Sequence, residues 1–239
     1  FEAFKAGNVH SREESDTGKW ARNYDFPAIH QGRVKKVEIP HQHQVGMQAF
    51  VFNTRRDIFK DPRVRRALAY VFDYDWLNKN MFHGEMVRTT SFFDNTDLAA
   101  KNLPTGAELA LLEPFRAQLP REVFEEPYTL PTFAKGSRDN LKIAQQLLKD
   151  AGWVIKAGKL VNETTGQPFT FEIILNVPEN EKTALPFARD LKKLGIDVVV
   201  RTIDAAQYEN RRVNMNFDMI LHFWGHTLSP GNEQSFYWS

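Results

Sequence analysis

The sequence contains no cysteine, which excludes disulfide bridges, thiolate nucleophiles and cysteine metal ligands. It also lacks any apolar run approaching the roughly 18 residues that a membrane-spanning helix requires. Charge of one sign is not in excess, because 31 basic and 30 acidic residues are spread without long blocks of like charge. Such a surface has no general attraction for polyanions, so nucleic acid is not expected as a partner.

The motifs of common enzyme classes are missing as well. The chain has no G-x-G-x-x-G or G-x-x-x-x-G-K-S/T loop, no G-x-S-x-G and no H-E-x-x-H. Ser229 lies in a Pro-Gly turn without the surroundings of a nucleophile. His41 and His43 have strand spacing, but no carboxylate or cysteine follows at a metal-ligand spacing. The sequence therefore predicts no catalytic residues, no metal site and no cofactor.

What the chain does contain is the alternation of strands and helices of an α/β protein. Its 239 residues have an ordinary globular composition, with 42% hydrophobic residues. Strands are expected at Arg33–Ile39, Met47–Asn53, Phe169–Leu175, Ile196–Ile203 and the segment beginning at Phe217, with a hairpin over residues 153–161. Helices are expected after Asp61, from Asp73 to Gly84, after Thr105, at Ser137–Ala151, at Glu181–Leu194 and after Asp204. This order predicts a partly parallel sheet covered by helices.

The two ends of the chain have unusual sequences. Residues 1–7 look like the last turns of an amphipathic helix that ends at Gly7, and three aromatic residues precede Ser239. Both ends are therefore expected to have been cut from a longer protein.

The stretch from Phe217 to Gln234 is the most informative for function. A strand-like first half runs into Gly, Ser, Pro and Asn residues, and this loop carries Trp224, His226 and Glu233. Loops at the ends of sheet strands often hold ligand-contacting groups in α/β proteins. The alternatives are a buried strand with a plain surface turn, and a hydrolase that uses Glu233 and His226 as a general acid/base pair.

Four motifs occur in order along the chain: Asp61–Tyr70 (DPRVRRALAY), Ala144–Trp153 (AQQLLKDAGW), Leu194–Val198 (LGIDV) and Phe217–Met219 (FDM). Together they resemble family 5 of the solute-binding proteins, the peptide-binding components of ABC importers. The resemblance covers nearly the whole chain, and Ser229–Gln234 further resembles a YejA-like oligopeptide-binding subgroup.

The resemblance implies a bacterial periplasmic receptor of two lobes that closes over a peptide and delivers it to ABC permease subunits. On this mapping residues 1–46 are the tail of the first lobe, residues 47–224 are the second α/β lobe, and residues 225–239 are a return loop into the first lobe. Met47–Asn53 and Phe217–Gly225 are then the crossing strands. The rest of the first lobe is missing from the chain, and the full-length protein is expected to be a monomer. A receptor for a non-peptide ligand on the same fold is the remaining alternative.

The ligand is expected to contact Asn53, Trp224, Gly225, His226, Thr227 and Glu233. We expect Asn53 and Trp224 to meet, and a peptide to pair with the return strand through its main chain. In the well-known dipeptide and oligopeptide receptors that this chain resembles, an aspartate three residues after the tryptophan pairs with the free α-amine of the ligand. Thr227 stands at that position here. The amine is therefore expected to contribute less to binding, unless Glu233 replaces the aspartate.

Overall fold

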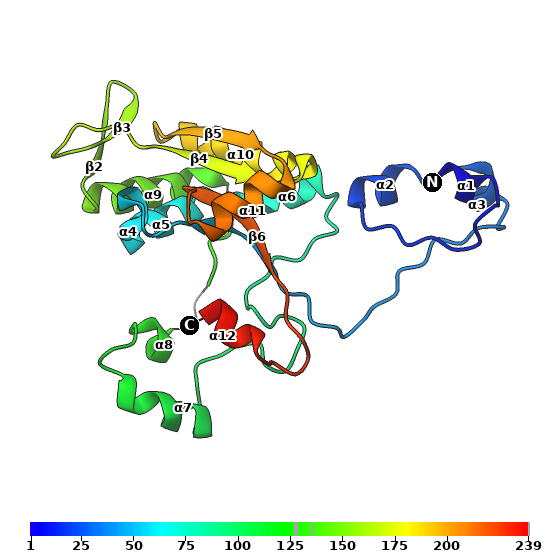
Figure 1. Cartoon of the computed structure of the whole chain (residues 1–239), viewed down its shortest axis with the longest axis horizontal. Coiled ribbons are helices and arrows are strands. Elements are labelled where there is room, and N and C mark those ends of the chain that lie inside the picture. Colours follow the sequence, from blue (N-terminus) through cyan, green and yellow to red (C-terminus); the bar gives the residue numbers. More distant parts are fainter. Residues whose placement is uncertain (127–128, 135, 239) are drawn as a thin grey trace. The chain divides into compact units, whose positions relative to one another are not determined.

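The computed structural model describes residues 1–126, 129–134 and 136–238, and the chain forms two compact units. The smaller unit comprises Phe1–His41 and Asp73–Arg88, and the larger unit comprises Gln42–Phe72 and Thr89–Ser239 (Figure 1). Within the described ranges, no helix has both the length and the apolar character needed to cross a bilayer. Along the sequence, the chain passes from the smaller unit into the larger one at Gln42, returns to the smaller unit at Asp73 and re-enters the larger unit at Thr89.

The smaller unit is built from short helices around aromatic side chains. Its helices are α1 (Glu2–Lys5), α2 (Thr17–Arg22), α3 (Pro27–His30) and α6 (Tyr74–Met81). The Asp73 carboxylate caps α6 by accepting a hydrogen bond from the Trp76 amide at 2.9 Å, and a positive φ of 82° at Gly84 follows the helix, as predicted. Phe1 and Phe4 pack against Tyr24 and Phe26 as the aromatic centre.

The strand predicted at Arg33–Ile39 is wrong, because this segment has no regular secondary structure. Val37 and Ile39 are 61% and 80% exposed, so their alternation has neither a core nor a partner strand to face. Helices α2 and α3, which the sequence reading missed, begin at the short-range signals Asp16 and Pro27. Local capping thus determines this region more strongly than periodicity does.

The larger unit contains a mixed four-stranded sheet in the order β1-β6-β4-β5. Its strands are β1 (Met47–Phe52), β4 (Thr170–Leu175), β5 (Asp197–Thr202) and β6 (Met219–Trp224). Strand β4 runs parallel to β5 and β6, and β1 runs antiparallel to β6, which confirms the predicted partly parallel sheet. The predicted hairpin is also present, as β2 (Trp153–Lys156) and β3 (Lys159–Asn162) joined by Ala157 and Gly158 with positive φ.

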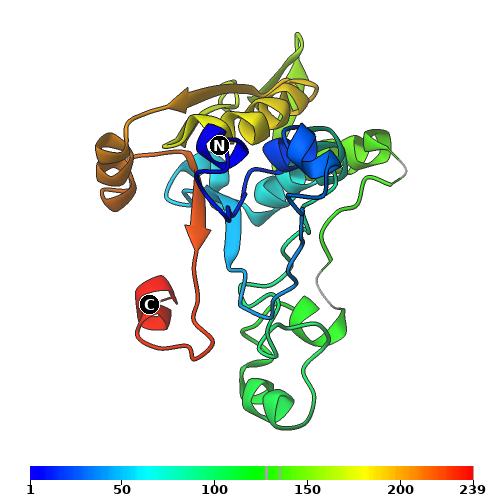
Figure 2. The same ribbon diagram turned by 90° about the vertical axis from the view of Figure 1, so that its right-hand side faces the viewer.

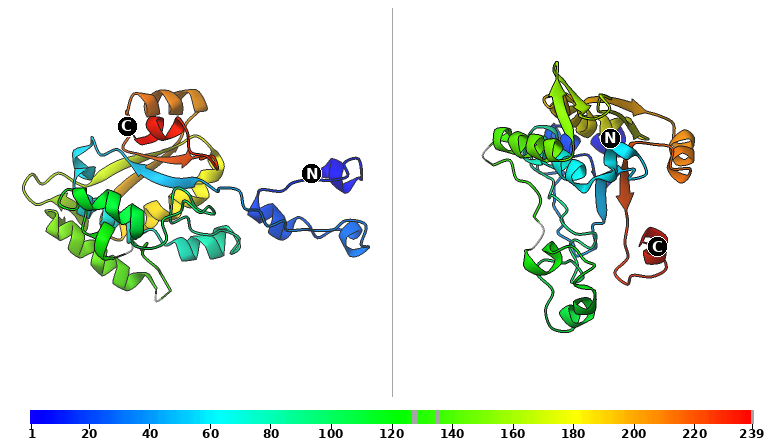
Figure 3. Two further views of the ribbon diagram at one scale, coloured as in Figure 1. Left: turned by 90° about the horizontal axis from the view of Figure 1, so that it is seen from below. Right: turned by 90° about the vertical axis from the view of Figure 1, so that its left-hand side faces the viewer.

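Helices cover both faces of this sheet, as Figure 3 shows in its left-hand view. They are α4 (Asp57–Lys60), α5 (Pro62–Ala69), α9 (Ser137–Asp150), α10 (Glu181–Lys192) and α11 (Ala205–Val213). Alternate β4 side chains point to opposite faces: Ile173 lies in the large core with α5, α9 and α10, whereas Ile174 lies in a small core with Tyr208 of α11. The sheet is thus held rigidly from both sides.

The predicted helix starts at Asp61 and Asp204 are confirmed. The Asp61 carboxylate accepts from the Arg63 amide at 2.8 Å and precedes Pro62, and the Asp204 carboxylate accepts from the Gln207 amide at 2.9 Å. A helix also follows Thr105, although the Thr105 side chain forms no capping hydrogen bond. The remaining helices are α7 (Gly106–Leu112), α8 (Glu122–Glu125) and α12 (Glu233–Trp238), with 3₁₀ turns at Glu113–Phe115 and Pro178–Asn180.

Candidate ligand-binding site

Strands β1 and β6 form an antiparallel pair that carries the site at one end. The register pairs Phe52 with Met219 and Met47 with Trp224, and Figure 2 shows the two strands side by side with β6 continuing toward α12. The Asn53 amide donates to the Asp218 carbonyl at 2.9 Å, so Asn53 lies at the end of the pair opposite to Trp224. The six residue steps from Asn53 to Met47, the partner of Trp224, correspond to about 20 Å. The prediction that Asn53 and Trp224 meet is therefore wrong.

Asn53 instead fastens the turn that precedes β6. It is 3% exposed, and its Nδ2 donates to the carbonyls of Met215 at 2.9 Å and Phe217 at 2.8 Å. Its Oδ1 accepts from the Arg55 amide at 3.1 Å. Met215 has a φ of 52°, which a non-glycine residue adopts only when its surroundings hold it. The side chain thus has its hydrogen-bonding groups engaged in the fold.

The carboxyl-terminal half of β6 extends beyond its neighbour β4. The two strands pair only through Met219 and Ile220 of β6. The next carbonyl on that side, at Leu221, accepts from the Tyr208 hydroxyl at 2.6 Å. Burial raises the pKa of Tyr208 to about 12, so the phenol stays protonated and remains a donor. Because strand main-chain groups alternate in direction, Phe223 is the following residue whose N–H and C=O face away from β1.

Trp224 ends β6 among other rings. Its indole lies 5.6 Å from the Phe92 ring and 4.9 Å from the His222 imidazole, both edge to face, and it is half-buried. Burial and the nearby Arg212 guanidinium lower the pKa of His222, which keeps this imidazole neutral near pH 7. Gly46, which directly precedes β1, has a φ of 68°, and a Cβ there would lie 2.4 Å from the Trp224 carbonyl oxygen. Only glycine permits this close approach.

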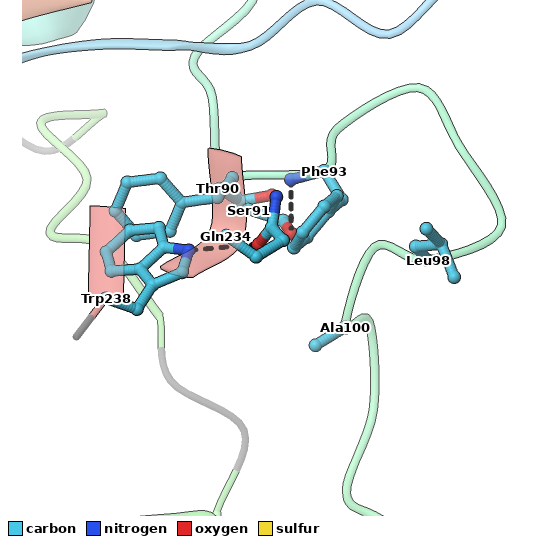
Figure 4. A pocket seen from close by; sticks show the side chains of 8 residues that line it. Thr90, Ser91, Phe93, Leu98, Ala100, Gln234 and Trp238 are labelled. Atoms are coloured by element: carbon cyan, nitrogen blue, oxygen red, sulfur yellow. Dashed lines mark hydrogen bonds between the residues drawn. The ribbon is translucent and has the colours of Figure 1, made fainter. Parts of the chain in front are cut away.

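His226, predicted as a ligand contact, is 5% exposed and belongs to a hydrogen-bonded chain with α12. The Gln234 amide nitrogen lies 3.2 Å from His226 Nδ1. Trp238 Nε1 donates to Gln234 Oε1 at 3.0 Å, as Figure 4 shows. Gln44 donates to the His226 carbonyl. The imidazole also packs against the Phe93 ring, with centroids 4.6 Å apart. These contacts fix the path of the chain after β6.

Glu233 closes the loop between β6 and α12. Its Oε1 accepts from the Gly231 amide at 3.0 Å and lies 3.4 Å from Thr227 Oγ1, which donates to the Ser229 carbonyl at 2.6 Å. The Gly231 N–H, as the largest influence, lowers the pKa of Glu233, so its carboxylate is ionised at neutral pH. The Gln234 amide lies between His226 and Glu233, at 3.2 and 3.5 Å. This arrangement does not present His226 and Glu233 as a hydrogen-bonded acid/base pair.

The structure therefore brings together five of the six predicted residues, Trp224, Gly225, His226, Thr227 and Glu233, and leaves Asn53 apart. It adds residues that sequence reasoning missed, namely Phe92, Phe93, Gln234 and Trp238. The sequence offered two signals for these residues, a Phe-Phe pair in a polar segment and the aromatic run of residues 236–238. The aromatic run lies in a stretch that was expected to be a loop and that instead contains helix α12. Among the described residues, no group of three metal-ligating side chains occurs, including around His41 and His43.

Comparison with known proteins gives a family match over the whole chain. The model for bacterial extracellular solute-binding proteins, family 5 middle domain, matches residues 1–239. A curated relative from Agrobacterium fabrum, described as probable peptide-binding protein YejA, is 43% identical over 242 residues, which cover 100% of this chain and 39% of the relative. The chain thus spans about two fifths of the length of that relative.

Solved structures show the same fold. NikA from Brucella suis, in complex with Fe(III)-EDTA, has a TM-score of 0.63 and 21% identity, covering 93% of this chain and 38% of that one. The oligopeptide-binding protein AppA from Bacillus subtilis, in complex with a nonapeptide, has a TM-score of 0.57 and 20% identity, covering 80% of this chain and 33% of that one. The predicted α/β lobe of the periplasmic-binding-protein kind, with a mixed sheet, is therefore confirmed.

Proposed function

The chain belongs to family 5 of the bacterial extracellular solute-binding proteins, and from this premise we propose that it is part of a receptor that binds oligopeptides and delivers them to an ABC permease. Members of this family are binding proteins and not enzymes. The proposed location is the periplasm, and the proposed ligand lies between two lobes. The relative described as peptide-binding supports the choice of ligand.

The observation that carries the proposal is the open end of β6. Beyond Ile220 this strand has no pairing with β4, and the Tyr208 hydroxyl occupies the Leu221 carbonyl. The main chain at Phe223 and Gly225 is then positioned to pair with an extended peptide, as in β-strand addition, while Trp224 supplies an apolar wall. Main-chain pairing of this kind binds peptides of many sequences, which suits an importer of oligopeptides.

The proposed domain organisation follows from the same two strands. Residues 47–224 are assigned to the second lobe, which the crossing segments Met47–Asn53 and Phe217–Gly225 connect to the first lobe. The compact units of the structure divide the chain differently, because Asp73–Arg88 belong to the smaller unit and the residues after Trp224 to the larger one. Residues 1–46 and 225–239 belong to that first lobe or approach it. The antiparallel pairing of β1 with β6 supports this arrangement, because it places the start of β1 and the end of β6 together. The complete receptor acts as a monomer with the permease subunits as its partners.

The experiment that tests this function is prolonged incubation of the complete receptor with a defined oligopeptide, followed by mass spectrometry of the bound fraction. A binding protein retains the peptide and releases it intact, since Gln234 separates His226 from Glu233. Cleavage of the peptide would contradict the proposal and support the hydrolase alternative. Retention of a metal chelate or sugar, with no retained peptide, would support a receptor for a non-peptide ligand.

A second expectation concerns the free α-amine of the peptide. Thr227 offers a neutral hydroxyl that is engaged with the Ser229 carbonyl, whereas an aspartate at this position would offer a charged acceptor. A charged hydrogen bond contributes about 1.5–3 kcal/mol and a neutral one about 0.5–1.5 kcal/mol, so amine selectivity should be about tenfold weaker than with aspartate. Calorimetry with one peptide in free and N-acetylated forms should therefore give affinities within about tenfold of each other.

Matched variants separate the effect of an acid at position 227 from the effect of Glu233. Thr227→Asp should restore a preference for the free amine, and Thr227→Asn, which is similar in size but neutral, should not. Glu233→Gln should leave the ratio of the two affinities unchanged. If acetylation weakens binding of the unaltered receptor by about a hundredfold or more, and Glu233→Gln removes that difference, Glu233 is the amine anchor and the expectation is wrong.

A further inference from the structure

An open hollow of about 610 Å³ lies next to Trp224 in the larger unit. Its lining comes from two segments far apart in the sequence, as Figure 4 shows. These lining residues are Thr90, Ser91, Phe92, Phe93, Leu98, Ala100, Gln234 and Trp238. None of them carries a formal charge, and the volume falls within the range of about 300–1,000 Å³ that is typical of ligand pockets.

The polar side chains of this lining are engaged with protein groups. Because the Trp238 indole is a donor only, its bond to Gln234 requires Oε1 to face Trp238 and the NH₂ group to face His226 Nδ1. Ser91 Oγ accepts from the Phe93 amide at 3.1 Å, and the Thr90 hydroxyl donates to the Asp94 carboxylate at 3.4 Å. A polar occupant would find few unused partners here, so the hollow favours carbon surfaces.

Large apolar side chains stand open in the same hollow. Trp238 is 51% exposed and Leu98 is 52% exposed, and the ring of Phe92 lies 4.7 Å from Trp238, edge to face. The bond to Gln234 holds the Trp238 indole in this orientation, so the wall is preformed. A side chain that covers these surfaces removes apolar area from water, and this hydrophobic contribution to the binding free energy would favour its binding in the hollow.

The hollow is continuous with the open end of β6 through one side chain. Phe92 lines the hollow and also contacts Trp224, at 5.6 Å between ring centroids. A peptide whose main chain pairs at Phe223 therefore has this hollow within reach of a neighbouring side chain. We propose that the hollow is a specificity subsite for one uncharged, apolar side chain of the bound peptide, and that Gln234 is a positioning residue for its Trp238 wall. This inference rests on the proposed function.

The test is calorimetry of the complete receptor with a small set of tripeptides. Trialanine is compared with peptides that carry Phe, Leu or Asp in place of one alanine, at each position in turn. At one position we expect Phe to bind about tenfold or more tightly than Ala, with Leu between them and Asp weaker than Ala. Trp238→Ala and Leu98→Asp should each reduce the ratio of the Phe and Ala affinities at that position to about one.

A matched control is Leu111→Asp, which places the same charge on a 75% exposed leucine of α7 outside the lining, and should leave that ratio as it was. Gln234→Leu should lower the ratio less than Trp238→Ala does, because the indole remains but loses its hydrogen bond. The inference is overturned if the peptides bind with equal affinity at every position, or if the Phe preference survives both Trp238→Ala and Leu98→Asp. Failure of all tripeptides to bind would instead overturn the proposed function together with it.

Discussion

Replacing Trp224 with alanine is expected to weaken oligopeptide affinity of the complete receptor by about 30-fold or more, the size of effect that defines a binding hot spot. A tryptophan buries about 150–250 Å², which at about 25 cal/mol per Å² gives an upper bound of about 4–6 kcal/mol when a ligand covers it. Trp224 is half-buried and held by Phe92 and His222, so part of this area is already covered and the expected effect lies below the bound. Calorimetry at a fixed salt concentration measures it.

Trp153 provides the control for this prediction. It is 8% exposed and packs on Phe169 in the large core, with ring centroids 4.5 Å apart. Trp153→Ala should lower the melting temperature strongly, whereas the fraction that remains folded should bind peptide normally. If Trp224→Ala behaves in the same way, with a lowered melting temperature and unchanged affinity, then Trp224 is a core residue and its assignment to the ligand site is wrong.

Replacing Asn53 is expected to destabilise the fold by about 2–4 kcal/mol with little change in peptide affinity. Asn53→Leu removes the bond to the Met215 carbonyl, at about 1–3 kcal/mol for the group left without this partner. It also removes the bond to the Phe217 carbonyl, at about 0.5–1.5 kcal/mol, because that carbonyl still accepts from Arg56 Nε at 3.2 Å. The site at Trp224 lies about 20 Å away along the strand pair. Urea unfolding measured by circular dichroism gives the loss of stability, and calorimetry at low temperature gives the affinity.

Two further variants define the cause of this destabilisation. Asn53→Asp keeps the acceptor for the Arg55 amide but loses both donors, so it should be as damaging as Asn53→Leu. Asn214→Ala removes an exposed amide that donates to the Asn210 carbonyl, and should cost about 0.5 kcal/mol or less. A stable Asn53→Leu receptor with greatly weakened peptide binding would show that Asn53 contacts the ligand, as the sequence reading first suggested.

The secondary structure was largely predictable because its signals are local. Asp61 before Pro62 fixes a helix start, and the apolar runs of Met47–Phe52 and Met219–Trp224 fix two strands. The relative position of Asn53 and Trp224 was not predictable from each strand alone, since it depends on the antiparallel register between them.

The site was predictable only where its residues are neighbours in sequence. The run from Trp224 to Glu233 was found because turn-forming residues follow a strand. The contact of Phe92 with Trp238 was not predicted, because it joins segments that are distant in the sequence. Helix α12 was not predicted either, because it lacks a strong apolar stripe. Its Tyr237 and Trp238 are held instead by ring contacts with His226 and Phe92, which a helical period does not reveal.

The complete receptor is expected to bind oligopeptides at the open end of β6, and one calorimetric titration tests this binding most directly. A tetraalanine peptide is compared with three analogues, each N-methylated at one peptide bond. We expect saturable one-to-one binding of the unmodified peptide and a loss of about fivefold to tenfold for at least one analogue, because methylation removes a main-chain donor needed to pair with Phe223. Equal affinities for all four peptides, or no binding of any of them, would contradict the account.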